Sequence, residues 1–193
     1  MKFEDGTSMR LYRQTVEDFG LYTGKELEDD ELKNLRAAAG QMSSKMRAVR
    51  IISASSVSKA DLERRLVEKG ENKQDARQAV AWLADMDLLD DQKTASQVVQ
   101  SCIAKGYGPA RAKQALYEKR IPKEYWDAAL EDYPDQSEKI QAFLEKRLTG
   151  ELTDKDLRKA TDALLRRGHS YHEIRKALQA FSEKVDLQED IYG

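Results

Sequence analysis

Signals that start and stop helices alternate at short intervals through residues 58–133. Ser58 and Asn72 are each followed three residues later by an aspartate, the pattern of a helix N-cap with a carboxylate near the positive end of the dipole. Gly70 and Gly106 follow apolar residues, where a left-handed C-cap is least costly for glycine. Two further helix starts are marked by proline, at Pro109 and Pro122. The stretch therefore predicts successive helices joined by very short turns.

A pattern of four positions, spaced 4, 6 and 4 residues apart, recurs with offsets of 50 and 48 residues. The first position closes a helix, the second is its C-cap, and the last two lie one turn apart on the next helix. A third helix precedes each pair, over residues of about 30–56, 91–105 and 136–148. The three sets are Leu66, Gly70, Ala76 and Val80; Leu116, Arg120, Trp126 and Leu130; and Leu164, Gly168, Ile174 and Leu178.

We therefore expect a mainly α fold of three tandem three-helix repeats in an elongated array, preceded by a small N-terminal β-hairpin. The hairpin is predicted because Asp5-Gly6 favours a tight turn and residues 9–13 alternate in polarity. The predicted boundaries are 1–29 for the hairpin and leader, 30–91, 92–134 and 135–185 for the repeats, and 186–193 for an acidic tail.

The first repeat begins with a long helix whose apolar stripe recurs at steps of three and four residues. Such a stripe is typical of a core face rather than a ligand face. Its members are Leu32, Leu35, Ala39, Met42, Met46, Val49 and Ser53. In the second repeat, we expect Asp90 and Asp91 to cap the next helix and Tyr107 to pack at a corner. Burial is predicted for Tyr107, Leu116, Trp126 and Leu130.

Composition excludes several classes of protein. The net charge of −2 gives no argument for a nucleic-acid or membrane partner, and no apolar run approaches the roughly 18 residues that a membrane span needs. Met1 to Asp5 do not resemble a signal peptide, and the single cysteine, Cys102, cannot build a disulfide framework. We expect a cytoplasmic monomer.

No catalytic or phosphate-binding motif is present: the chain has no GxxxxGK(S/T), no GxGxxG after a strand and no GxSxG. His169 and His172 lie three residues apart, but no cysteine or further histidine completes a metal-binding set. We interpret them as surface or capping residues. The sequence predicts no enzymatic activity, no cofactor and no metal.

Residues 58–133 resemble the RecX family of regulatory proteins, which modulate the bacterial recombinase RecA. The resemblance covers about 75 residues and rests on Leu89-Asp90-Asp91, Ala95, Gly106-Tyr107-Gly108, Arg111, Leu116, Lys119 and Ile121. Asp87-Leu88 replaces the family's usual Gly-Tyr, and Arg120 replaces the glycine of Lys-Gly-Ile. A non-glycine residue at a left-handed C-cap costs about 1 kcal/mol, so both changes affect local turn geometry rather than the fold.

Basic residues gather in two stretches, 105–123 with six cations against one acid and 155–176 with seven against three. One interpretation is a solvated helix surface. The other is a binding surface for an acidic protein face or for phosphates. The candidate partner-binding residues are Lys105, Arg111, Lys113, Lys119, Arg120, Arg166 and Arg167.

The resemblance implies a regulator that binds the RecA nucleoprotein filament and inhibits its ATPase, strand-exchange and coprotease activities in DNA repair, recombination and the SOS response. Free DNA would be bound weakly, because the cations are scattered over an acidic protein. Two alternatives stay open on the sequence. One is a helical-repeat adaptor that holds another protein or peptide on its concave face, and the other is an unrecognised enzyme.

Overall fold

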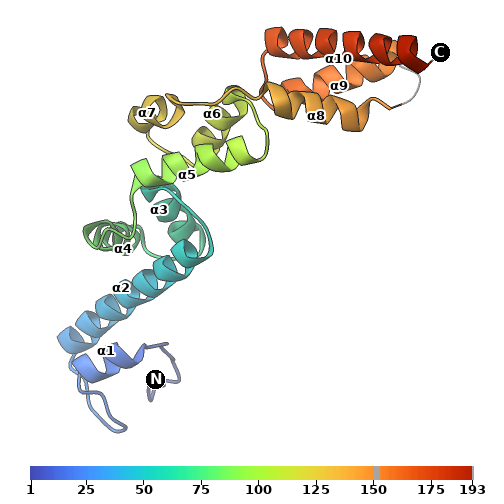
Figure 1. The fold of residues 1–193 in the computed structure, drawn as a ribbon. Helices are drawn as coiled ribbons and strands as arrows, with labels where there is room; N and C mark the ends of the chain where they lie inside the picture. The colour runs from blue at the N-terminus through green and yellow to red at the C-terminus, as the bar shows by residue number, and fades with distance from the viewer. Residues whose placement is uncertain (150–152, 193) are drawn as a thin grey trace. The chain divides into compact units, whose positions relative to one another are not determined.

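The computed structural model describes residues 1–149 and 153–192, and for residues 184–192 it describes the backbone alone. The chain forms two compact units, Met1–Asp91 and Gln92–Gly193. The first unit contains α1 (Arg13–Asp18), α2 (Asp29–Ala54), α3 (Lys59–Glu68) and α4 (Lys73–Asp85), shown in Figure 1. The rest of the chain forms α5 (Asp91–Ala104), α6 (Pro109–Glu118), the 3₁₀ turn η1 (Lys123–Tyr125), α7 (Trp126–Leu130), α8 (Ser137–Arg147), α9 (Asp154–Arg166) and α10 (Tyr171–Tyr192).

The prediction of a mainly α fold is confirmed, but the predicted N-terminal β-hairpin is wrong. The first nine residues form a turn with a single antiparallel bridge, between Lys2 and Ser8, and the described residues contain no strand. The Asp5 carboxylate accepts hydrogen bonds from the backbone N–H and the hydroxyl of Thr7, at 2.8 and 2.6 Å, which closes the turn locally. The predicted second strand, residues 9–13, runs into α1, which begins at Arg13 with Tyr12 as its N-cap. Two short segments without a third strand have too few partners to form a sheet.

A hydrophobic core in the first unit is shared by α2, α3 and α4. The predicted stripe on α2 is only partly buried: Leu35 lies in the interior, but Ser53 is exposed and the other members are intermediate. Ser44 and Ala48 are buried instead. The helix is turned this way because the buried Glu71 carboxylate accepts hydrogen bonds from the hydroxyls of Ser43 and Ser44, at 3.0 and 2.9 Å.

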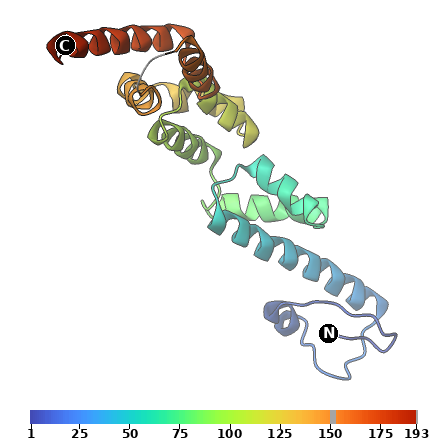
Figure 2. The ribbon, with the colours of Figure 1, turned by 90° about the vertical axis from the view of Figure 1, so that its right-hand side faces the viewer.

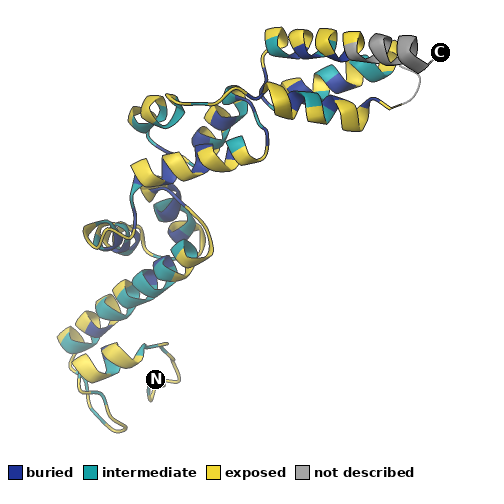
Figure 3. Cartoon of the chain, in the orientation of Figure 1, coloured by how far each residue is buried: buried dark blue, intermediate teal, exposed yellow. Residues whose placement is uncertain are grey.

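In the second unit, one hydrophobic cluster joins α5, α6 and α7, and another joins α8, α9 and α10. These last three helices pack against one another, as Figures 1 and 2 show. Leu116 is fully buried, as predicted, whereas Tyr107, Trp126 and Leu130 are half-buried. Trp126 is held at the edge of its cluster because its indole N–H donates to the Ile121 carbonyl, at 3.0 Å. Figure 3 shows that the helices of both clusters also carry exposed positions.

The repeated C-cap positions adopt the same backbone conformation. Gly70, Arg120 and Gly168 have φ of 89°, 55° and 85°, and in each case the following N–H bonds the carbonyl of the leucine four residues before the cap, at 3.1 to 3.2 Å. Asp87, with φ of 56°, closes α4 in the same way. The left-handed C-cap geometry is therefore kept at Asp87 and Arg120, the two positions where the sequence departs from the family's pattern. The predicted acidic tail begins inside α10, where the side chains of residues 184–192 lie outside the described part, as does all of Gly193.

Candidate protein-binding surface

Two helix corners of the second unit dock against each other through their backbones. One is the α5–α6 corner, Gly106-Tyr107-Gly108, and the other is the α9–α10 corner, Arg167-Gly168-His169. The N–H of Gly108 donates to the carbonyl of Arg167 at 2.8 Å, and Nε2 of His169 lies 3.0 Å from the carbonyl oxygen of Gly106. We call this pair of corners the interlock. It joins segments that are about 60 residues apart in the sequence.

Two glycines allow the backbones to approach this closely. A Cβ atom on Gly108 would lie 2.1 Å from the carbonyl oxygen of Gly168, and a Cβ on Gly168 would lie 2.2 Å from the backbone nitrogen of Arg111. Both clashes are with backbone, so no side-chain rotation could relieve them. The Gly-Tyr-Gly signature therefore has a packing role, as the sequence predicted, although the corner it contacts could not be identified from the sequence.

Tyrosine side chains support the same corner. The hydroxyl of Tyr133 donates to the carbonyl of Tyr107 at 2.6 Å. Burial raises the pKa of Tyr133 to about 12, so the phenol stays protonated and keeps its donor. The corner is thus held both by α9–α10 and by the segment after α7.

His169 is not a surface residue. It is 4% exposed, and burial lowers the pKa of its imidazole, so the ring is neutral near pH 7. With Nε2 facing a carbonyl acceptor, the proton resides on Nε2, and Nδ1 has no partner among the described residues. The sequence-based interpretation of His169 as a surface or capping residue is therefore wrong. The capping of α10 is made by the residues that follow it: the N–H of Ser170 donates to the Glu173 carboxylate at 2.7 Å, and the N–H of Glu173 donates to the Ser170 hydroxyl at 3.2 Å.

The interlock brings some of the predicted partner-binding residues together. Arg111 lies in the first turn of α6, directly against Gly168, and Arg167 is the residue whose carbonyl accepts the Gly108 hydrogen bond. Lys105 is also close, because its charge and that of Arg111 act on the buried thiol of Cys102, whose pKa is nevertheless raised by burial. Arg166 is exposed in the last turn of α9.

Other predicted residues lie apart from the interlock. Successive residues of a helix turn by about 100°, so Lys113 points roughly 160° away from Arg111 on α6. Lys119 and Arg120 close the same helix at its far end, about 15 Å from its start. The seven residues therefore do not form one face.

The charge of Arg111 is partly compensated within the chain. Its Nη1 lies 2.9 Å from Oε1 of Glu118, two turns further along α6. The hydrogen bond between them lowers the pKa of Glu118 and raises that of Arg111. Because this pair lies near the surface, it is worth little for stability.

Arg167 makes a contact that the sequence did not reveal. Its guanidinium carbon lies 4.5 Å from the centroid of the Phe143 ring on α8, and that of Arg147 lies 5.8 Å from the same centroid. Neither arginine forms an ion pair with a described side chain. Phe143 and Arg147 are four residues apart on α8, which was the only available sign in the sequence, and nothing linked them to the end of α9.

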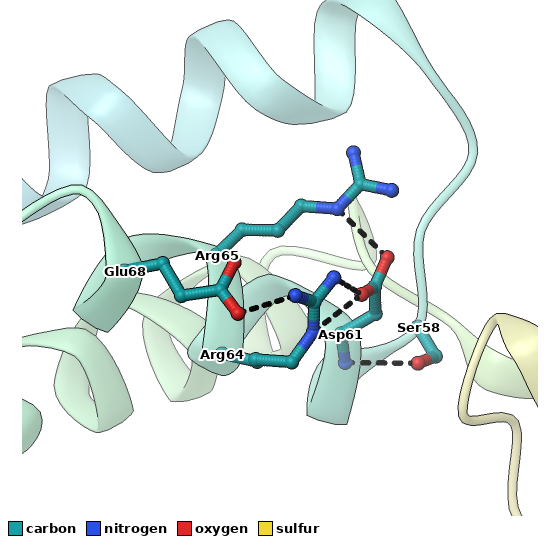
Figure 4. A network of polar contacts seen from close by, with 5 residues as sticks. All are labelled: Ser58, Asp61, Arg64, Arg65 and Glu68. Carbon is teal, nitrogen blue, oxygen red and sulfur yellow. Dashed lines mark hydrogen bonds and ion pairs between the residues drawn. The ribbon is translucent and has the colours of Figure 1, made fainter.

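The start of α3 in the first unit holds a separate polar network, drawn in Figure 4. The Asp61 carboxylate is 2% exposed and lies 2.7 Å from Arg64 Nη2 and 2.8 Å from Arg65 Nε. Ser58 caps the helix by accepting from the N–H of Asp61 at 3.1 Å. The carboxylate is satisfied by its own helix. This network therefore stabilises the start of α3 in the first unit.

One predicted cap acts on a different helix from the one expected. The buried Asp91 carboxylate accepts a hydrogen bond from the N–H of Lys59, at 2.8 Å, and so caps α3 rather than its own helix α5. The interaction spans 32 residues, which is why local sequence reasoning assigned it wrongly.

Among the described residues, no three His, Cys, Asp or Glu side chains are placed to hold a metal ion. None of the described helices is long and apolar enough to cross a membrane.

Comparison with known proteins agrees with this arrangement. Residues 90–130 match the family model described as RecX, second three-helix domain. Regulatory protein RecX of Vibrio campbellii is 30% identical over 143 residues, which cover 72% of this chain and 92% of that protein. Regulatory protein RecX of Stenotrophomonas maltophilia is 32% identical over 123 residues, which cover 62% and 76%.

Solved structures share the fold. A crystal structure of regulatory protein RecX has a TM-score of 0.66 at 20% identity and covers 92% of both chains. RecX from Lactobacillus salivarius has a TM-score of 0.62 at 23% identity, covering 75% of this chain and 98% of that one. From the similarity to the curated relatives, the chain belongs to the RecX family of regulatory proteins.

Proposed function

We propose that this protein binds the RecA nucleoprotein filament and inhibits its ATPase, strand-exchange and coprotease activities, acting in the cytoplasm as a monomer. Membership of the RecX family carries the proposal. Its support in the structure is the interlock, which fixes Arg111 and Arg167 on one rigid part of the second unit. A rigid cationic surface loses little conformational entropy when it binds a partner.

Inhibition follows from contacts with more than one filament subunit. Each group of three helices would make a weak contact, and once one is docked the others act at high effective concentration. Bridging neighbouring subunits stabilises one arrangement of the filament over those through which it passes during ATP turnover. The ATPase rate should therefore fall without competition for the nucleotide site.

The test is a RecA ATPase titration on single-stranded DNA, together with co-sedimentation. The variant Arg111→Glu/Lys119→Glu should lose at least about tenfold in filament affinity, roughly 1.4 kcal/mol, because it reverses two of the predicted partner-binding charges, one near each end of α6. Lys155→Glu/Arg158→Glu is the matched control, since both residues are exposed near the start of α9 and the change in net charge is the same.

Circular dichroism of both variants checks that the helices are intact. Equal inhibition by the two variants would remove Arg111 and Lys119 from the mechanism. Failure of the unaltered protein to inhibit the RecA ATPase at micromolar concentration would reject the proposed function. If the protein co-sediments equally well with single-stranded DNA that carries no RecA, the inhibition would be assigned to DNA binding. Affinity should also fall as salt rises, because exposed charges are screened over about 8 Å at physiological ionic strength.

A further inference from the structure

We infer that Arg147 and Arg167, held against the Phe143 ring, form a binding site for the carboxylate groups of an acidic protein segment. The inference rests on the proposed function only for the identity of the partner. It adds the chemistry that the partner must present and a site that includes two residues, Phe143 and Arg147, outside the predicted set.

Two cations converge on one small area of the second unit. Both guanidinium carbons lie over the same ring, at 4.5 and 5.8 Å from its centroid, so they are separated by no more than the sum of these distances. Like charges repel, and neither arginine has a carboxylate partner among the described side chains. A carboxylate bound beside either guanidinium would be attracted to both charges and would lessen that repulsion. Arg111, in contrast, already has Glu118 as its partner.

Both arginines are held in place. The backbone of Arg167 is fixed at the interlock, since its carbonyl accepts from Gly108 and its N–H bonds the carbonyls of Ala163 and Leu164. Arg147 lies in the last turn of α8, where the negative end of the helix dipole favours a cation. Phe143 is half-buried and packs on the core of α8, α9 and α10, so the ring is a firm support.

Stacking on the ring decides which atoms of each guanidinium are available. A guanidinium over an aromatic ring uses its flat face, and its N–H groups, which lie in its own plane, stay free to donate. A carboxylate accepts two such N–H groups side by side, and this fork geometry is specific to arginine. Two arginines on one ring can therefore each bind one carboxylate of a segment that carries neighbouring acids.

The nearest cation towards the start of α8 does not compete for this role. Lys139, one turn before Phe143, donates to the carbonyls of Ile103 and Ala104 at the end of α5. It caps that helix and its charge is occupied there. Arg147 is exposed and Arg167 half-buried, so the open side of the site faces solvent.

Observations favour a protein carboxylate over a nucleic acid. Bases bind single-strand proteins by stacking on open aromatic faces, but here guanidinium groups already lie over the Phe143 ring. The net charge of −2 also disfavours association with a long polyanion. A short acidic segment needs only a local pair of cations.

The experiment uses the full-length protein and two probes of matched charge, a hexaglutamate peptide and a thymidine heptanucleotide. NMR of the arginine side-chain Nε–Hε groups follows the titration at physiological ionic strength. Hexaglutamate should shift the signals of Arg147 and Arg167 and leave those of Arg158 and Arg175 unchanged. The variant Arg147→Gln/Arg167→Gln should lower affinity for the peptide by about tenfold.

Two further variants make the result specific. Arg158→Gln/Arg175→Gln removes the same charge from exposed positions on α9 and α10, and should bind like the unaltered protein. Arg147→Lys/Arg167→Lys keeps the charge but loses the fork geometry, and should bind with intermediate affinity.

Equal losses in the two glutamine variants, or shifts spread over all arginines, would overturn the site. If the oligonucleotide binds at Arg147 and Arg167 more tightly than hexaglutamate, the proposed partner of the site is wrong and a nucleic acid takes its place. RecA is left out of this experiment, so a positive result with hexaglutamate stands even if the filament is not bound, and a negative result rejects the site even if it is.

Discussion

Nε2 of His169 donates a hydrogen bond to the carbonyl oxygen of Gly106, 3.0 Å away, and so joins two helix corners that are 63 residues apart. The imidazole is buried and has no second partner among the described residues. Its contribution to folding therefore depends on its protonation state.

We predict that the free energy of unfolding decreases as the pH is lowered, and that His169 is responsible. Burial lowers the pKa of the imidazole in the folded protein below its ordinary value. The nearby Glu173 carboxylate raises this pKa by less than burial lowers it, and the positive charge of Arg167 lowers it further. The unfolded chain binds the proton more readily, so stability present above about pH 6.5 is lost as the pH falls from there through the folded pKa.

His169→Gln should show a smaller loss over the same range, since glutamine does not titrate. The measurement is the denaturation midpoint of both proteins between about pH 8 and pH 5. His172→Gln, at an exposed position on α10, is the control and should follow the unaltered protein. A parallel decline in all three proteins would show that other groups cause the pH dependence.

A second prediction concerns Gly108. A Cβ at this position meets the backbone of Gly168 at 2.1 Å, so Gly108→Ala should destabilise the second unit by about 3 kcal/mol, at the upper end of overpacking costs. Gly40→Ala on α2 is the comparison. Its Cβ would meet only Oδ2 of Asp75, at 2.8 Å, the end of a side chain that can rotate, and alanine is the better helix former by about 1 kcal/mol.

Thermal denaturation with NMR signals from both units should therefore separate the two substitutions. We expect a large decrease in the denaturation midpoint of the second unit for Gly108→Ala and little change in the midpoint of the first unit for Gly40→Ala. Similar midpoints for the two variants would mean that the interlock adapts to an added methyl group and is not tightly packed.

A third prediction concerns Arg120, whose φ of 55° is unfavourable for a residue with a Cβ. Arg120→Gly should stabilise the chain by up to about 1 kcal/mol, and Arg120→Asn by less, because asparagine tolerates this conformation better than arginine does. Gly70→Ala, at the equivalent position of the first repeat, should cost a similar amount. A Cβ there meets nothing within 4 Å, so only the backbone conformation is changed.

Chemical denaturation of the three variants gives the free energies of unfolding. Destabilisation by Arg120→Gly would indicate that contacts of the arginine side chain outweigh the strain at its backbone.

Local sequence signals predicted the helices and their ends. Ser58 and Asn72 cap the helices they were expected to cap, because an N-cap is made within one turn of the chain. Gly70, Arg120 and Gly168 share a left-handed conformation for the same reason. The prediction of an N-terminal hairpin failed because a strand needs a partner strand, and the Asp5-Gly6 turn has only a single bridge beside it.

The features of the candidate site also separate into those that local sequence predicts and those that depend on tertiary packing. Sequence by itself determined the family, the basic stretches and the structural role of Gly106-Tyr107-Gly108. Only the tertiary structure decided that His169 lies in the interior and that Asp91 caps α3. The contact of Phe143, Arg147 and Arg167 also needed it, because these residues come from two helices whose register no local pattern specifies. Capping is set by neighbours in the chain, whereas burial and long-range pairing are set by how helices pack.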